Sequence, residues 1–277
     1  MSEAGPNKPN TIDSQFWLAD QFIYTGLDSD YNNPDIRRLA LGVKATHKTQ
    51  YLDQENKYGH EWYPVGDEFV DALDRPWDMC TAQIYFDPEY VHDAEYRDEF
   101  VARICRRGQK WLNALQFDLL PWHEDDTMLP FLEKVKSQTK HTIILQAHGE
   151  AMDRLGKEGV VRKLGKYAHA LDYVLFDASH GKGVRMDTDA LLPYLDAAYK
   201  STELEGVGFG VAGGLCAEVV AEELPKLLKK HRNLSVDAEG QLHGTYADGS
   251  YGLDWDKSRD YMQAVHDVLY ALRHGNV

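Results

Sequence analysis

Residues 142–177 read TIILQAHGEAMDRLGKEGVVRKLGKYAHALDYVLFD. The stretch opens with an apolar run, 142–146, that is typical of a buried strand, and it closes with a second such run, 173–176. Between them lies a segment of helical length, from about 152 to 169. Two buried strands joined by a helix are typical of a β-α-β unit in a parallel sheet, so this stretch predicts an α/β fold.

The same alternation repeats along most of the chain. It predicts strands at 81–86, 115–117, 207–211 and 233–236, and helices at 93–109, 125–138, 188–199, 217–230 and 255–273. Two more units fit into the first 80 residues, as a strand at 22–25 before a helix from Pro34, and a faint strand around Thr49–Leu52. Eight units predict a TIM (β/α)8 barrel that forms a single domain over residues 15–277, after a disordered or extended tail at 1–14.

The composition restricts the partners that we expect. The chain has 30 basic and 45 acidic residues, a net charge of −15, which disfavours binding to nucleic acid. No apolar run is long enough to span a membrane, and three cysteines are too few for a disulfide framework. We therefore expect a cytoplasmic monomer or homodimer that binds a small-molecule substrate, and neither nucleic acid nor a membrane.

Candidate catalytic residues lie where the predicted strands end, because barrel enzymes carry their chemistry at the C-terminal ends of the strands. Asp177 directly follows four apolar residues and is the preferred acid. Asp28, Asp118 and His148 are candidates for the base, and Glu150, His180 and Asp237 are further candidates for binding the substrate. An aspartate in such a position is also a common helix cap, which remains the structural alternative for each one.

Glycines follow the last two strands. Gly213, Gly214 and Gly240 would allow backbone N–H groups to approach an anion at a helix N-terminus, although each could equally form a plain turn. Glu239 stands at the same place and would repel an anion.

A metal site is a further possibility, because several potential ligands come from four different strand ends and could converge on a divalent cation. No histidine pair shows a familiar ligand spacing, however, and we predict no metal. The potential ligands are His148, His180, Asp118, Asp177 and Asp237.

The polar and aromatic segment 53–66 is predicted to be a loop over one end of the barrel. It could serve as a lid or be an ordinary surface insertion.

The C-terminal part of the chain resembles phosphoribosylanthranilate isomerase. The resemblance rests on residues 174–177, 181–183, 187–194, 211–215, 235–240 and 252–258. It implies a TIM barrel that works without a cofactor, with Asp177 as the acid. It also implies that Gly183, Gly213, Gly214 and Gly240 hold a substrate phosphate, with Asp237 near the ribose.

The chain departs from this family at several positions. Thr25 stands where the family has its catalytic cysteine, and a threonine hydroxyl cannot replace a thiolate unaided. Glu239 replaces a serine of the phosphate loop. The resemblance therefore implies a diverged member that isomerises a sugar or sugar-phosphate derivative by acid–base chemistry, rather than the tryptophan-pathway reaction itself. The alternatives are a metal- or cation-binding barrel hydrolase or lyase, and a non-catalytic homologue retained for binding or assembly.

Overall fold

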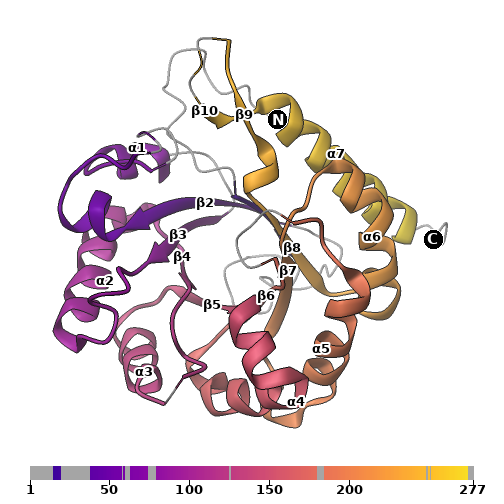
Figure 1. The fold of residues 1–277 in the computed structure, drawn as a ribbon, viewed down its shortest axis with the longest axis horizontal. Helices are drawn as coiled ribbons and strands as arrows, with labels where there is room; N and C mark the ends of the chain where they lie inside the picture. The colour runs from indigo at the N-terminus through magenta and orange to yellow at the C-terminus, as the bar shows by residue number, and fades with distance from the viewer. Residues whose placement is uncertain are drawn as a thin grey trace.

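A closed barrel of eight strands, joined in sequence order, forms the centre of the molecule (Figure 1). The computed structural model describes residues 15–19, 38–57, 59, 63–73, 79–124, 126–179, 184–247, 249 and 251–273. The strands are β1 (Gln15–Ala19), β2 (Arg38–Thr46), β3 (Met79–Tyr85), β4 (Ala114–Asp118), β5 (Thr142–His148), β6 (Tyr173–Asp177), β7 (Gly208–Ala212) and β8 (Leu234–Ala238).

Helices follow most strands and surround the barrel (Figure 1). They are α1 (Glu68–Leu73), α2 (Ala94–Gly108), α3 (Met128–Gln138), α4 (Gly149–Tyr167), α5 (Thr188–Lys200), α6 (Ala217–Lys230) and α7 (Trp255–Arg273). Two short strands, β9 (His243–Thr245) and β10 (Tyr251–Leu253), form a separate antiparallel pair. The predicted α/β barrel fold is confirmed. None of the helices that the structure describes is long and apolar enough to cross a membrane.

The barrel departs from eight parallel units at β1. This strand pairs antiparallel with β2 and with β8, so that Trp17 lies opposite both Ala40 and Asp237. The pairs from β2 to β8 are all parallel. A closing strand needs only backbone hydrogen bonds to its two neighbours, and a strand of either direction supplies these. The prediction of eight parallel units is therefore wrong at this position.

The β9–β10 pair was not predicted, and the other differences from the predicted elements lie in the first 80 residues. The helix expected from Pro34 is wrong over Arg38–Thr46, which forms β2, and the faint strand at Thr49–Leu52 is wrong because His47–Tyr51 forms a π-helical turn. Asn-Pro resembles a helix start, but the pairing of β2 with β3 outweighs this local preference. The strand predicted at 22–25 and the tail at 1–14 lie outside the described residues.

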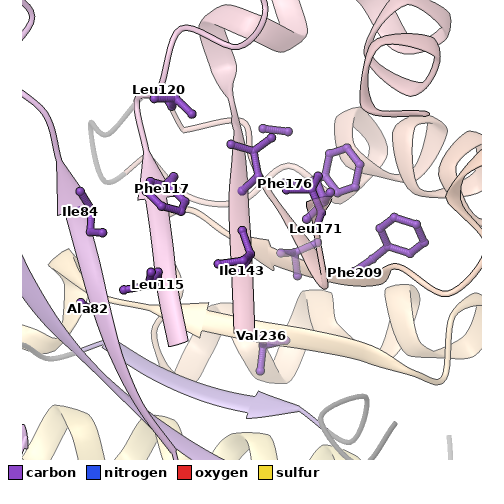
Figure 2. Close-up of a cluster of buried hydrophobic side chains, with 14 of the residues drawn as sticks. Ala82, Ile84, Leu115, Phe117, Leu120, Ile143, Leu171, Phe176, Phe209 and Val236 are labelled. Atoms are coloured by element: carbon purple, nitrogen blue, oxygen red, sulfur yellow. The ribbon is translucent and has the colours of Figure 1, made fainter. Parts of the chain in front are cut away.

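Apolar side chains form two layers. The larger layer lies between the strands and the helices, and Figure 2 shows part of it, including Ile84, Phe117 and Phe176, which are fully buried. The smaller layer faces the lumen of the barrel. Successive side chains of a strand point to opposite faces, so positions at steps of two from this inner layer continue along the lumen. The inner layer consists of Ala40, Met79, Ala114, Ile144, Tyr173, Leu175 and Ala212.

We predict that Phe117→Ala lowers the free energy of unfolding by about 3–5 kcal/mol, because it leaves a cavity in the outer layer. The centroid of the Phe117 ring lies 5.6 Å from the ring centroid of Phe131 and 6.2 Å from that of Phe86. Urea denaturation measures the change. Val184→Ala, at a side chain that is 56% exposed, is the control and should change stability little. Equal losses in the two variants would contradict this account of the core.

Candidate functional site

Polar side chains line the lumen towards the C-terminal ends of the strands. In β3, β4 and β5 a glutamine is followed two residues later by another polar residue, Tyr85, Asp118 or His148. Barrel lumens are normally filled by Val, Ile and Leu, so this polar lining indicates a binding or catalytic site. The buried polar residues at inward-facing positions include Lys44, Gln83, Gln116, Asp118, Gln146, His148, Asp177 and Ser235.

Asp118 ends β4 and is only 1% exposed. One carboxylate oxygen accepts a hydrogen bond from Gln83 Nε2, and the other accepts one from Gln116 Nε2 at 3.1 Å. Burial raises the pKa of Asp118 to about 7, although both amide donors act in the opposite direction. A carboxyl group with a pKa near neutral can both accept and donate a proton under physiological conditions.

The backbone is strained directly after Asp118. Leu119 has a φ of 54°, in the left-handed region that bulky side chains rarely adopt, and its side chain is 60% exposed. Strain of this kind costs about 1–3 kcal/mol and concentrates at functional sites. The sharp turn ends β4 at Asp118 and leaves its carboxylate at the last lumen position of the strand.

Lys44 and Glu239 form an ion pair that joins β2 to the residue after β8, with side chains 5% and 22% exposed. Burial opposes ionisation of Glu239, but the Lys44 ammonium and the Gln83 amide outweigh it, so the pKa of Glu239 lies below its usual value. Gln83 Nε2 lies 3.3 Å from Glu239 Oε2 and also donates to Asp118. Two carboxylates and one ammonium therefore share a single network.

Two tyrosines surround the Lys44 amine. Its Nζ lies 3.4 Å from the Tyr63 hydroxyl, 4.9 Å from the Tyr63 ring centroid and 5.5 Å from the Tyr85 ring centroid. Tyr63 belongs to the segment 53–66, and Gln50 anchors this segment by donating to the Pro64 carbonyl at 2.6 Å. The loop predicted to lie over one end of the barrel thus reaches the C-terminal end through Tyr63.

Asp177 and His148 are register partners at the ends of β6 and β5. Asp177 is 8% exposed and accepts hydrogen bonds from Gln146 Nε2 at 3.1 Å and from the Ser179 N–H at 2.8 Å. His148 is 6% exposed, and burial lowers its pKa. Glu150 lies in the first turn of α4 and is exposed. The structure brings these residues to one end of the barrel, and their catalytic or binding roles stay predictions.

The glycines after β7 are packed against the chain itself. Gly213 and Gly214 have φ values of 105° and 61°. A Cβ on Gly213 would lie 2.7 Å from an Asp177 oxygen, and one on Gly214 would lie 2.1 Å from the Val184 carbonyl oxygen. Gly240, by contrast, has open space beside it. Of the other predicted residues, Asp237 is buried in β8, whereas Thr25, Asp28, His180 and Gly183 lie outside the described residues.

Within the described residues, no group of three or more His, Cys, Asp or Glu side chains is arranged to hold a metal ion. The convergence of four strand ends on a cation, which the sequence left open, therefore gains no support from the described ligands.

The sequence interpretation missed Lys44 and the two glutamines that contact Asp118. Lys44 was missed because its segment was expected to be helical. Gln83 and Gln116 carried a signal, because each is the polar residue inside an otherwise apolar strand and lies two positions before the strand end. Strand periodicity places such a pair of positions on the same face.

The comparisons with known proteins support the fold alone. No family model matches the chain, and no curated protein sequence matches it. A solved structure of the recombinant flavin-binding domain of baker's yeast flavocytochrome b2 matches with a TM-score of 0.50 and 14% identity. The match covers 94% of this chain and 61% of that chain, so this chain spans less than two thirds of that structure.

The resemblance to phosphoribosylanthranilate isomerase is wrong. The structural match is to a flavin-binding domain, and no sequence comparison supports the isomerase family. Short strands that end in aspartate and glycine pairs before helices are general features of α/β barrels, and they account for the similarity of pattern.

We predict that Gly214→Ala lowers the free energy of unfolding by about 2–4 kcal/mol, because the new Cβ meets a backbone carbonyl and the positive φ becomes strained. Thermal or urea unfolding measures the loss. Gly240→Ala is the matched control, because its Cβ would enter open space. A Gly214→Ala variant as stable as Gly240→Ala would show that the close packing after β7 is absent.

Asp118 should make stability depend on pH. Its folded pKa of about 7 lies above the usual value of 3.8, so between these values the folded chain holds a proton that the unfolded chain has lost. Stability should therefore fall as pH rises from about 4 to about 7, by about 1.4 kcal/mol per unit of pKa displacement, and then level off. Urea unfolding of the wild type and Asp118→Asn across this range measures the difference, which would be constant if Asp118 had an ordinary pKa.

Proposed function

We propose that the chain is a barrel enzyme that moves a proton on a small, uncharged, hydroxylated carbonyl compound, with Asp118 as the proton-transfer group. The observation that carries the proposal is the buried Asp118 carboxyl with a pKa of about 7, in one network with the Lys44–Glu239 ion pair. The α/β barrel fold supports the location, because catalytic groups of such enzymes lie at this end.

The chemistry follows from the charges. As a carboxylate, Asp118 would remove a proton from the carbon next to the substrate carbonyl. The electron pair of the broken C–H bond then forms the carbon–carbon double bond of an enediolate, and the negative charge moves to the former carbonyl oxygen. Lys44 is the positive charge of the network and would stabilise this oxygen. The hydroxyl group on the deprotonated carbon then passes its proton to the former carbonyl oxygen. Return of the first proton from Asp118 to the former carbonyl carbon leaves a new carbonyl at the neighbouring carbon, which completes an isomerisation.

The lining of the lumen favours an uncharged substrate with hydroxyl groups. Lys44 is already paired with Glu239, and the carboxylates of Asp118 and Asp177 lie at the same end of the barrel. An anionic group would therefore be repelled. Gln83 Oε1, Gln116 Oε1 and Thr81 Oγ1 are buried with no hydrogen-bond partner among the described residues. Such atoms are costly to leave unpaired, and the hydroxyl groups of a substrate would supply the missing donors.

We do not propose that this chain binds a flavin, although the structural neighbour is a flavin-binding domain. A flavin nucleotide carries a phosphate, which α/β barrels commonly bind after the seventh and eighth strands. In this chain the space beside Gly213 and Gly214 is filled by Asp177 and by the Val184 backbone, and the carboxylate of Glu239 follows β8. These residues do not fit a phosphate.

Hydrogen exchange tests the proposal. We expect the enzyme to exchange the carbon-bound proton next to the carbonyl in at least one member of a panel of unphosphorylated three- to six-carbon hydroxyaldehydes and hydroxyketones, measured by proton NMR in heavy water. Asp118→Asn should lower the rate about 100-fold or more, because it removes the proton-transfer group. The wild-type rate should rise with pH and level off above about 7, as Asp118 ionises.

Asp126→Asn is the control for this experiment. Asp126 has a half-exposed side chain and pairs with Lys163 and Lys166, away from the barrel lumen. Its substitution should leave exchange unchanged. Exchange that persists at the wild-type rate in Asp118→Asn would show that another group moves the proton.

A further inference from the structure

Two histidines lie against each other beside the end of β5, outside the Asp118 network. His148 ends β5, and His123 lies in the segment that follows β4. Trp122 fixes this segment, because it is fully buried and its Nε1 donates to the Gln146 carbonyl at 3.0 Å. The two imidazole rings have centroids 5.0 Å apart and planes at 83°.

The ring nitrogens of this pair lack partners. His123 and His148 are 5% and 6% exposed. Nδ1 and Nε2 of His123 and Nε2 of His148 are buried without a hydrogen-bond partner in the part of the chain that the structure describes. Buried polar atoms are almost always paired in folded proteins, and three unpaired nitrogens on adjacent rings point to a ligand that the chain alone does not supply.

The hydrogen bonding of His148 leaves one of its ring nitrogens for a ligand. A backbone hydrogen bond to Leu120 acts on His148, and because Nε2 has no partner this bond belongs to Nδ1. Histidine ligands are commonly held in this way, with one nitrogen bonded to a carbonyl and the other left for the metal.

The spacing and the surrounding charges agree with a cation. Two imidazoles bound to one zinc ion through bonds of about 2.0–2.1 Å have ring centroids roughly 5 Å apart. The negative charge of Glu150 acts on both rings. The nearby cations have carboxylate partners of their own, since Arg154 lies 3.6 Å from Glu124 and Lys163 lies 2.9 Å from Asp126.

We propose that His123 and His148 bind a divalent transition-metal ion of the zinc type through their ring nitrogens. The described residues supply no third His, Cys, Asp or Glu ligand in place. Water or an oxygen of a bound molecule therefore fills the remaining positions, as in metal sites that keep open positions. Imidazole nitrogen selects zinc, cobalt and nickel over magnesium and calcium, so the site discriminates between these classes.

Cobalt titration tests the proposal. The full chain, freed of metal by a chelator, is titrated with Co²⁺ and followed by its visible absorption. We expect an absorption band that Zn²⁺ abolishes and Mg²⁺ does not, and binding at least about tenfold weaker in His123→Ala and in His148→Ala. His169→Ala is the matched control, because His169 is exposed and pairs with Glu133, and it should bind cobalt as the wild type does.

Thermal unfolding without metal checks that each variant is folded. If His148→Ala does not fold, the cobalt affinity of His123→Ala alone tests the proposal. Absence of a cobalt band, or unchanged affinity in His123→Ala, overturns the proposal. Asp118→Asn should bind cobalt with wild-type affinity. Loss of proton exchange in that variant with cobalt binding intact separates the metal proposal from the function proposed for Asp118.

Discussion

The ion pair between Lys44 and Glu239, which lies beside the buried carboxyl group of Asp118, is the interaction on which the candidate site depends. Removing an ion from water costs several kcal/mol, and the attraction of a close partner must offset this cost. Lys44 is in contact with Glu239, so the pKa of Glu239 is lowered although its side chain is largely buried. Asp118 is left with neutral donors, the amides of Gln83 and Gln116 and the hydroxyl of Tyr85, and the negative charge of Glu239 further raises its pKa. The reactivity of Asp118 thus follows from the pairing of its neighbours.

The rest of the barrel keeps this arrangement fixed. The outer layer, including Phe117 and Phe176, contains most of the buried apolar side chains, while the lumen contains a small apolar cluster and many polar groups. A polar lumen stabilises less than an apolar one, and its unpaired amide oxygens are a cost. The strained φ of Leu119 at the end of β4 is a second cost at the same place. Both costs are concentrated where the proposed chemistry occurs.

The sequence predicted the regular part of this fold well and the irregular part poorly. From β3 to β7 each barrel strand is a largely apolar run followed by a helix, and periodicity is sufficient to locate these elements. The prediction was wrong for Arg38–Thr46. An Asn-Pro pair upstream resembles a helix start, but this segment forms a strand because it pairs with β3. The antiparallel β1 left no signal of direction at all. Asp118, His148 and Asp177 end neighbouring strands, as the sequence predicted, and their roles in a site stay predictions. The partners of Asp118 were not predicted, although Gln116 lies on the same strand and Gln83 lies on the neighbouring strand β3.

The glycines after β7 show why a sequence motif alone does not establish a ligand. Two glycines between a strand and a helix allow an anion to approach backbone N–H groups, and they equally allow two parts of the same chain to approach each other. In this barrel the glycines allow two parts of the chain to approach each other. The Val184 backbone occupies the space that a side chain at Gly214 would need, and the Asp177 carboxylate occupies the space that one at Gly213 would need. Glu239 was the residue that distinguished the two cases in the sequence. Its carboxylate fits a site that holds Lys44, and a phosphate at the same position would compete with it for that ammonium.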